Sequence, residues 1–416
     1  MTQRVLIKNI SILAGVYDEN PGKVSGAAMK SLPVLKDAWL AIENGVIADY
    51  GTMETWGGIS DWTGLEVIDA GEGAVLPAWC DSHTHLVFAA TREEEFVHRI
   101  NGLSYEEIAK RGGGILNSAD KMAAIDEYEL FEQSRLRLNE VMHLGTGAIE
   151  IKSGYGLDLE SELKMLRVIR QLRDAAPIPV KSTFLGAHTI PRRHLGNRDA
   201  YIKELIDVII PEVGKQQLAD YCDVFCERNY FSEDETVRIL EAAAKYGMKA
   251  KVHANQLSKS GGVQAGVRTN AISVDHLEYM GDEEIALLKN SSTMPVLLPG
   301  AAFFLSLPWP PAREMIDSGL SVAVASDYNP GSCPSGNMNQ MLSFLCVAQR
   351  MTPEEAIHAA TINGAYAMNL DQTLGSITPG KQANLIITHP VKNLAAIPYH
   401  FGSNPVAQVL VNGMTI

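Results

Sequence analysis

The hydrophobic pattern of the chain changes near residue 74 and again near residue 374. Between these points, eight apolar runs of strand length alternate with stretches whose apolar residues have helical spacing, as in 158–175, 234–246 and 282–289. The runs lie at residues 74–83, 146–156, 178–188, 221–230, 248–256, 270–279, 292–301 and 320–331. Eight consecutive βα units predict an α/β protein built on a (β/α)₈ TIM barrel.

The two ends of the chain have a shorter, alternating pattern. Residues 4–75 predict strands at 5–13, 38–51 and 65–71, with a surface loop at 18–31. After the eighth run, Thr352 precedes Pro353 and Glu355, which predicts a helix that continues to about Met368. Short strands then return in 374–390 and 405–413. We therefore expect one β-sandwich domain formed by 1–75 and 374–416, beside a barrel domain of 76–373.

Composition limits the classes of partner. The 416 residues are 46% hydrophobic and 20% charged, which is typical of a soluble globular protein with a sizeable core. The net charge of −14, without a run rich in Lys or Arg, argues against nucleic acid and anionic membranes as partners. An anionic substrate would need particular arginines inside the site. The five cysteines show no C-x-x-C spacing, and 1–13 does not resemble a signal peptide, so a cytoplasmic protein is expected.

Polar residues with metal-binding side chains gather at the predicted strand ends. His83 and His85 are two residues apart at the end of the first run, so their side chains point to the same face. The other members of the set are His188 on run 3, His253 on run 5, His276 on run 6 and Asp327 on run 8. Because reactive groups of such barrels lie at the carboxyl ends of strands, this placement favours a metal site over histidines packed in the core.

His83, His85, His253 and Asp327 supply three nitrogens and one oxygen. Such a set leaves room for a water, whose pKa a divalent cation brings down to roughly 7. Run 4 ends in Cys226-Glu227 and offers no lysine for a carbamate bridge, which favours a single metal ion. Zinc and iron both accept these ligands, as manganese does, so the identity of the metal stays open.

This constellation resembles the amidohydrolase superfamily, whose metal-binding barrel is flanked by a composite β-sandwich. Within the superfamily the chain is similar to the imidazolonepropionase family, through residues 81–96, 153–168, 182–191, 222–227 and 326–334. The resemblance implies hydrolysis of the cyclic amide of 4-imidazolone-5-propanoate to N-formimidoyl-L-glutamate in histidine degradation. In this mechanism a hydroxide attacks the ring carbonyl, His276 stabilises the oxyanion, and Asp327 or His276 delivers a proton to nitrogen.

The resemblance also implies which residues contact the anionic substrate. Arg92 would bind the propanoate carboxylate, although an ion pair with Glu94 or Glu95 is the alternative. Tyr155 and His188 would hold the ring, although Tyr155 can also be a packed aromatic residue. The remaining contacts would come from Tyr105, in an insertion that can close over the site, and from Asn329, Gly331 and Ser332.

Two positions depart from the family pattern. Gln256 stands three residues after His253, where many members carry an acid, and Asn384 replaces an acid in the strand that re-enters the sandwich. An amide does not exchange protons at neutral pH, so Gln256 can orient the ring, while proton transfer falls to Asp327 and His276. The rival predictions are another cyclic amide or amidine hydrolase or deaminase, and a metal-free scaffold. A homodimer is expected, because dimers are common among such barrels.

Overall fold

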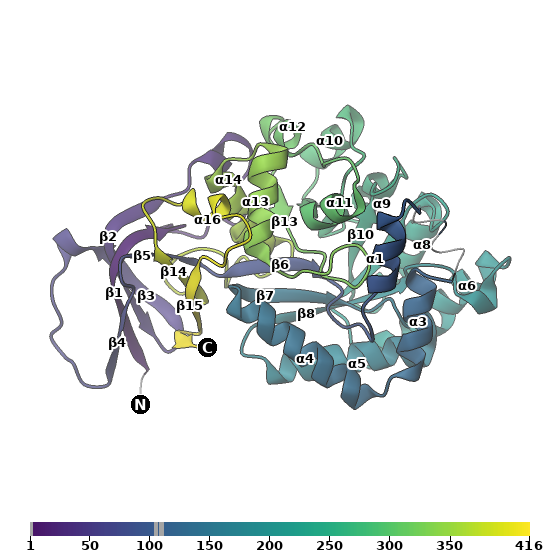
Figure 1. The fold of residues 1–416 in the computed structure, drawn as a ribbon, viewed down its shortest axis with the longest axis horizontal. Coiled ribbons are helices and arrows are strands. Elements are labelled where there is room, and N and C mark those ends of the chain that lie inside the picture. Colours follow the sequence, from purple (N-terminus) through teal and green to yellow (C-terminus); the bar gives the residue numbers. More distant parts are fainter. Residues whose placement is uncertain (1–2, 104–106, 108–111) are drawn as a thin grey trace.

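The computed structural model describes residues 3–103, 107 and 112–416, so the predicted contact Tyr105 lies outside the described residues. Eight parallel strands follow one another in chain order to form the barrel (Figure 1). They are β6 (Trp79–Thr84), β7 (Thr146–Lys152), β8 (Val180–Ala187), β9 (Tyr221–Cys226), β10 (Lys249–Ala254), β11 (Ser273–His276), β12 (Met294–Leu297) and β13 (Ala323–Val324). Each predicted run overlaps one of these strands, so the predicted barrel is confirmed, although the first run also covers most of β5 (Gly73–Pro77), a strand of the other sheet.

Helices cover the outside of the barrel and contribute apolar side chains to one large core between helices and strands. They are α1 (Glu93–Ile100), α3 (Ile115–Ala124), α4 (Glu127–His143), α5 (Leu159–Ala175), α6 (Arg198–Glu204), α7 (Ile210–Lys215), α8 (Glu233–Ala244), α9 (Gly262–Arg268), α10 (Asp282–Lys289), α11 (Pro299–Leu305), α12 (Ala312–Asp317), α13 (Met338–Gln349), α14 (Pro353–Ala360), α15 (Ile362–Tyr366) and α16 (Ala396–Tyr399). Short 3₁₀ or π turns are η1 (Gly26–Lys30), η2 (Met53–Thr55), η3 (Arg192–His194) and η4 (Leu205–Ile209). No helix in the described part of the chain is long and apolar enough to cross a membrane.

Local capping explains where several of these helices begin. Asp158 accepts a hydrogen bond from the Ser161 backbone N–H at the start of α5, and Ser232 forms a reciprocal capping box with Glu235 in α8. Thr352 forms the predicted capping box with Glu355 in α14. The predicted helix to Met368 is interrupted, however, because Thr361 leaves helical geometry (φ −115°, ψ −96°) between α14 and α15.

Both chain ends contribute to one eight-stranded sheet that lies beside the barrel (Figure 1). Its strands are β1 (Arg4–Ala14), β2 (Val34–Glu43), β3 (Val46–Thr52), β4 (Leu65–Asp69), β5 (Gly73–Pro77), β14 (Leu385–Pro390), β15 (Val406–Val411) and β16 (Met414–Thr415). β1 pairs with β4 along its first half and with β5 along its second half. Apolar side chains of this sheet form a core separate from that of the barrel. The domain limits at 75/76 and 373/374 stay predictions.

Two stretches of the amino-terminal part differ from their predictions. The predicted strand 38–51 is a hairpin, because Asn44 and Gly45 take φ values of 51° and 79° and turn the chain between β2 and β3. The predicted surface loop 18–31 contains η1, in which Met29 is fully buried against the barrel helices. Hydrogen bonds of Val24 with the Asn363 side chain and of the Met29 carbonyl with His358 also anchor this segment.

Asn384 joins the sheet to the barrel. Its side-chain N–H donates to the Gly147 carbonyl of β7 (2.9 Å), and its Oδ1 accepts from the Asn412 backbone N–H (2.9 Å). A carboxylate accepts hydrogen bonds but cannot donate one to a carbonyl. The amide therefore suits this position, where both a donor and an acceptor are needed.

Candidate active site

The seam that closes the barrel brings three of the predicted metal ligands together. His83 is the penultimate residue of β6, His85 follows that strand, and Asp327 lies three residues beyond β13. The Asp327 backbone N–H donates to the His83 carbonyl (3.0 Å), and the His85 N–H donates to the Tyr328 carbonyl (2.9 Å). Backbone pairing between the first and last strands therefore fixes the acid next to the two histidines.

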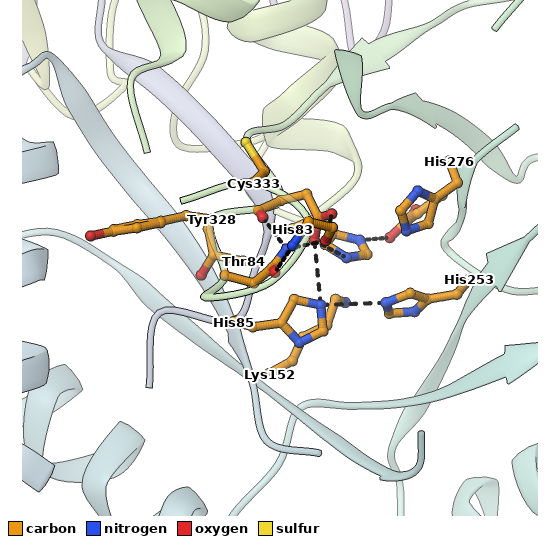
Figure 2. A network of polar contacts seen from close by, with 12 residues as sticks. His83, Thr84, His85, Lys152, His253, His276, Tyr328 and Cys333 are labelled. Carbon is orange, nitrogen blue, oxygen red and sulfur yellow. Dashed lines mark hydrogen bonds and ion pairs between the residues drawn. The ribbon is translucent and has the colours of Figure 1, made fainter. Parts of the chain in front are cut away.

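His253, near the end of β10, completes a tight group of ligand atoms. Asp327 Oδ1 lies 3.5 Å from Nε2 of both His83 and His85, and Nε2 of His85 lies 3.4 Å from Nε2 of His253. Figure 2 shows the imidazoles of His83, His85 and His253 turned toward one another, with His276 close by. Zinc–nitrogen bonds of about 2.1 Å would place tetrahedral ligands about 3.4 Å apart, so the spacing fits a metal site.

Hydrogen bonds behind the ring nitrogens decide what these atoms offer. His83 Nδ1 donates to Asp275 Oδ2 (2.6 Å), and His253 Nδ1 lies 2.9 Å from Asp223 Oδ2. With its proton on Nδ1, His83 presents the lone pair of Nε2 toward Asp327 Oδ1, 3.5 Å away. His83 Nε2 has no hydrogen-bond donor among the described residues. Ligand atoms of His83, His85, His253 and Asp327 converge at this point, and a cation would satisfy that arrangement.

Burial keeps the imidazoles of His83 and His85 neutral. It lowers the pKa of His83 and of His85 well below the usual range, and nearby cationic groups add to the effect. Burial also lowers the pKa of His276 to about 4 and raises the pKa of Asp327 to about 6. Neutral imidazoles are the form that binds a metal, so the electrostatics agree with the geometry.

A layer of buried charges that was not predicted from the sequence lies beneath the ligands. Lys152 Nζ lies 2.9 Å from Asp223 Oδ2 and 3.0 Å from Glu150 Oε1, and all three side chains are fully buried. Although burial opposes ionisation, His253 and Lys152 hold the pKa of Asp223 well below its usual range. Glu150 and Lys152 stand two residues apart in an apolar strand, a pattern that could have indicated charges facing the barrel interior.

Left-handed backbone occurs at three strand ends of the site. Asn255, His276 and Asp327 have φ values of 55°, 89° and 54°, which side-chain-bearing residues rarely adopt. The surrounding strands must compensate for this strain, and the side chains of His276 and Asp327 line the pocket. The backbone thus bends where the chemistry is placed.

A cavity of about 380 Å³ opens above the ligand atoms. Predicted site residues that line it are His85, Arg92, Tyr155, His188, His253, Gln256, His276, Asp327, Asn329 and Ser332. Apolar residues such as Leu103, Ile115, Phe225 and Phe304 form the rest of the wall. His83 lies below this cavity, fully buried, and Gly331 lies behind Arg92. The structure therefore places ten of the predicted residues around one pocket.

Tyr155 and His188 face the pocket from neighbouring loops. Their ring centroids are 5.4 Å apart, and the His188 ring stacks on His85 at 5.4 Å with an interplanar angle of 18°. His188 Nδ1 donates to the Gly154 carbonyl (2.9 Å), and burial lowers the pKa of His188 to about 3. Its Nε2 is therefore a hydrogen-bond acceptor at neutral pH.

The loop after β13 is folded around one amide. Asn329 Oδ1 accepts from the backbone N–H groups of Gly331 (2.8 Å) and Ser332 (2.7 Å), and Asn329 Nδ2 donates to the Asp327 carbonyl (2.6 Å). Ser332 Oγ donates to Asp327 Oδ2 (3.2 Å). This part of the predicted substrate site also fixes the orientation of the Asp327 carboxylate.

The barrel and its histidine–aspartate cluster define the class of protein, a metal-binding barrel hydrolase. The model of the amidohydrolase family matches residues 74–416. An imidazolonepropionase of Flavobacterium johnsoniae is 56% identical over 411 residues, covering 99% of each chain. One of Christiangramia forsetii is 55% identical over 412 residues, covering 99% of this chain and 100% of its own. The chain therefore belongs to the amidohydrolase family and, within it, to the imidazolonepropionases.

A solved structure supports the fold independently. The guanine deaminase of E. coli superimposes with a TM-score of 0.74 at 13% identity, covering 100% of this chain and 99% of that one. At this identity the likeness concerns the fold alone. The sequence relatives and the family together make the chain a hydrolase of carbon–nitrogen bonds in cyclic amides.

Proposed function

We propose that the chain hydrolyses the cyclic amide of 4-imidazolone-5-propanoate and releases N-formimidoyl-L-glutamate, a step of histidine degradation. The observation that carries this proposal is one pocket with a cluster of metal-ligand atoms at its base and Arg92 in its wall. The family and the relatives' shared name agree with this substrate. The oxygen of water is added to the ring carbonyl carbon, the carbon–nitrogen bond breaks, and the nitrogen receives a proton.

One divalent metal ion, zinc or iron, would be held by His83, His85, His253 and Asp327. When bound, such an ion supplies a water whose pKa lies near 7, and thus a hydroxide nucleophile at neutral pH. Asp223 and Asp275 would orient the ligand imidazoles through the hydrogen bonds to His253 and His83.

The substrate's functional groups match the pocket's donors and acceptors. The Nη groups of Arg92 carry N–H donors beyond those that bond to Glu95, and such donors suit the propanoate carboxylate. His188 Nε2 accepts a hydrogen bond from a ring N–H, and Tyr155 packs against the ring. Gln256 and Asn329, with Ser332, supply further polar contacts at the sides of the pocket. These contacts orient the carbonyl carbon toward the base of the pocket.

Asp327 and His276 would perform the proton transfers. Asp327 accepts the proton of the attacking water, since its carboxylate is held toward the ligand group by Ser332 and by its own backbone. The neutral His276 ring donates a hydrogen bond to the developing oxyanion. Asp327 then returns its proton to the leaving ring nitrogen, which completes the cleavage. Gln256, an amide, takes no part in proton exchange.

The test follows the ultraviolet absorbance of the imidazolone during incubation with purified protein. We expect turnover that is lost after metal removal and returns when zinc or iron is added. Undiminished turnover by the metal-depleted protein would contradict the mechanism. Turnover of a nucleobase ring in place of the imidazolone would identify the chain as another cyclic amidine hydrolase. The homodimer and the cytoplasmic location stay predictions.

A further inference from the structure

Arg92 is held by a carboxylate that belongs to no predicted site. Arg92 Nε donates to Glu95 Oε2 (2.8 Å), and Nη2 donates to the same oxygen. Only 5% of the Arg92 side chain and 11% of the Glu95 side chain are exposed, so the pair is not a surface ion pair. The alternative considered for Arg92 is thus present, but inside the pocket wall.

Glu95 also reaches a second segment of the chain. Its Oε1 accepts from the Gly114 backbone N–H (3.0 Å), just before α3, and the Asn117 side chain donates to the carboxylate as well. Although burial opposes it, the bonds from Arg92 and from these groups hold the pKa of Glu95 below its usual range. The carboxylate is therefore charged at neutral pH and joins α1 to the start of α3.

The backbone at Gly331 packs against another part of the Arg92 guanidinium group. A Cβ placed on Gly331 would lie 2.2 Å from Arg92 Nη1, so the guanidinium group rests directly against the glycine. Gly331 belongs to the loop organised by Asn329, whose polar side chain lines the pocket. Glu95 thus binds the Nε and Nη2 edge of the Arg92 guanidinium group, while Gly331 lies against Nη1.

We propose that Glu95 is a positioning residue for recognition of the substrate carboxylate, acting through Arg92. This inference rests on the proposed role of Arg92. The Glu95 charge opposes that of an anionic substrate, so its presence would weaken binding if attraction alone mattered. A long arginine side chain, however, loses considerable conformational freedom when it binds in one geometry. Glu95 removes that freedom in advance and keeps the buried cation paired.

The experiment compares two competitive inhibitors with the same ring, 3-(imidazol-4-yl)propanoate and 4-ethylimidazole, which lacks the carboxylate. The inhibition constant of 4-ethylimidazole divided by that of 3-(imidazol-4-yl)propanoate measures carboxylate recognition. Glu95→Gln and Glu95→Asp should each lower this preference about tenfold or more, because an oriented bond to a charged group is lost or displaced. The value of kcat should stay within about threefold. The matched control is Glu94→Gln, an exposed neighbour on the same helix, which should leave the ratio unchanged.

Each outcome decides something. Glu95→Asp keeps the charge but withdraws it by one methylene, so an unchanged ratio in this variant would overturn the positioning role. A ratio that rises in Glu95→Gln would show that charge repulsion dominates, and it would also overturn the inference. Arg92→Gln tests the proposed function separately: if it leaves the ratio unchanged, the carboxylate site is wrong. If only Arg92→Gln abolishes the preference, the inference alone fails. Circular dichroism and metal content establish that each variant is folded.

Discussion

Replacing Glu162 should loosen the loop that carries Tyr155. Glu162 is fully buried in the first turn of α5, and its carboxylate accepts hydrogen bonds from three backbone N–H groups of that loop. The donors are Gly154 (3.2 Å), Gly156 (2.8 Å) and Leu157 (2.9 Å). The Gly154 carbonyl in turn accepts from His188. One carboxylate thus supports both of the residues proposed to hold the ring.

The expected magnitude follows from the donor count. In Glu162→Gln, one acceptor oxygen becomes an NH₂ group, and the remaining oxygen cannot serve all three backbone donors. Losing a hydrogen bond to a charged acceptor costs about 1.5–3 kcal/mol, with a further cost for a buried N–H without a partner. A change of about 3 kcal/mol in the free energy of local opening corresponds to amide exchange faster by roughly 100-fold.

Hydrogen–deuterium exchange of a peptide that covers residues 153–157 measures this change directly. Because burial raises the pKa of Glu162, the measurement is made near pH 8, which favours the charged form. The matched control is Glu160→Gln, an exposed residue of the same helical turn. The KM for the imidazolone should rise in Glu162→Gln but not in the control. Equal exchange in all three proteins would refute the idea that Glu162 holds this loop.

Three further predictions concern the metal, the oxyanion and the folded state. Asp223→Asn should lower metal affinity about 10- to 100-fold, measured by competition with a chelator, because His253 loses its carboxylate partner. The control Asp234→Asn, at an exposed residue, should leave metal affinity unchanged. His276→Ala should lower kcat by a factor of about 10²–10⁴ with little effect on inhibitor binding, whereas a change in KM alone would contradict its role. Burial lowers the pKa of Lys381 to about 8, whereas an unperturbed lysine has a pKa of about 10.4. Between these two pH values the folded chain therefore binds fewer protons than the unfolded chain. The unfolding free energy of the unmodified chain, relative to that of Lys381→Met, should therefore rise by about 3 kcal/mol from pH 7.5 to pH 10.5, as measured by urea titration. An equal pH dependence of the two proteins would contradict this.

The sequence was sufficient for the barrel because each βα unit carries its own signal. Strand runs, helical periodicity and capping residues such as Asp158 and Ser232 are local, and short connections leave few arrangements of eight such units. The ligand set was predictable for a related reason. His83 and His253 lie near the carboxyl ends of their strands and Asp327 lies just beyond its own. These strand ends meet at one face of a barrel, so chain position alone indicates that the three residues converge.

The partners of these residues were not predictable, because they depend on the register between strands. His253 lies opposite Asp275 in the pairing of β10 with β11, yet its Nδ1 contacts Asp223 of β9. A shift of one residue would exchange these neighbours and turn the side chains to the other face. The burial of Met29 had no local signal either, since the few apolar residues of the loop at 18–31 have no period.

Three buried glutamates share one physical task around the pocket. Glu95 binds Arg92 and Gly114, Glu162 binds the loop of Tyr155, and Glu227 accepts from the backbone N–H groups of Leu257 (2.8 Å) and Ser258 (3.2 Å), beside Gln256. Each charge is met by several N–H dipoles or by a guanidinium, which offsets its repulsion of an anionic substrate. In a chain with a net charge of −14, Arg92 can therefore attract the substrate only at short range. Loops already held by such bonds need little ordering when the substrate binds, so binding energy remains available for the transition state.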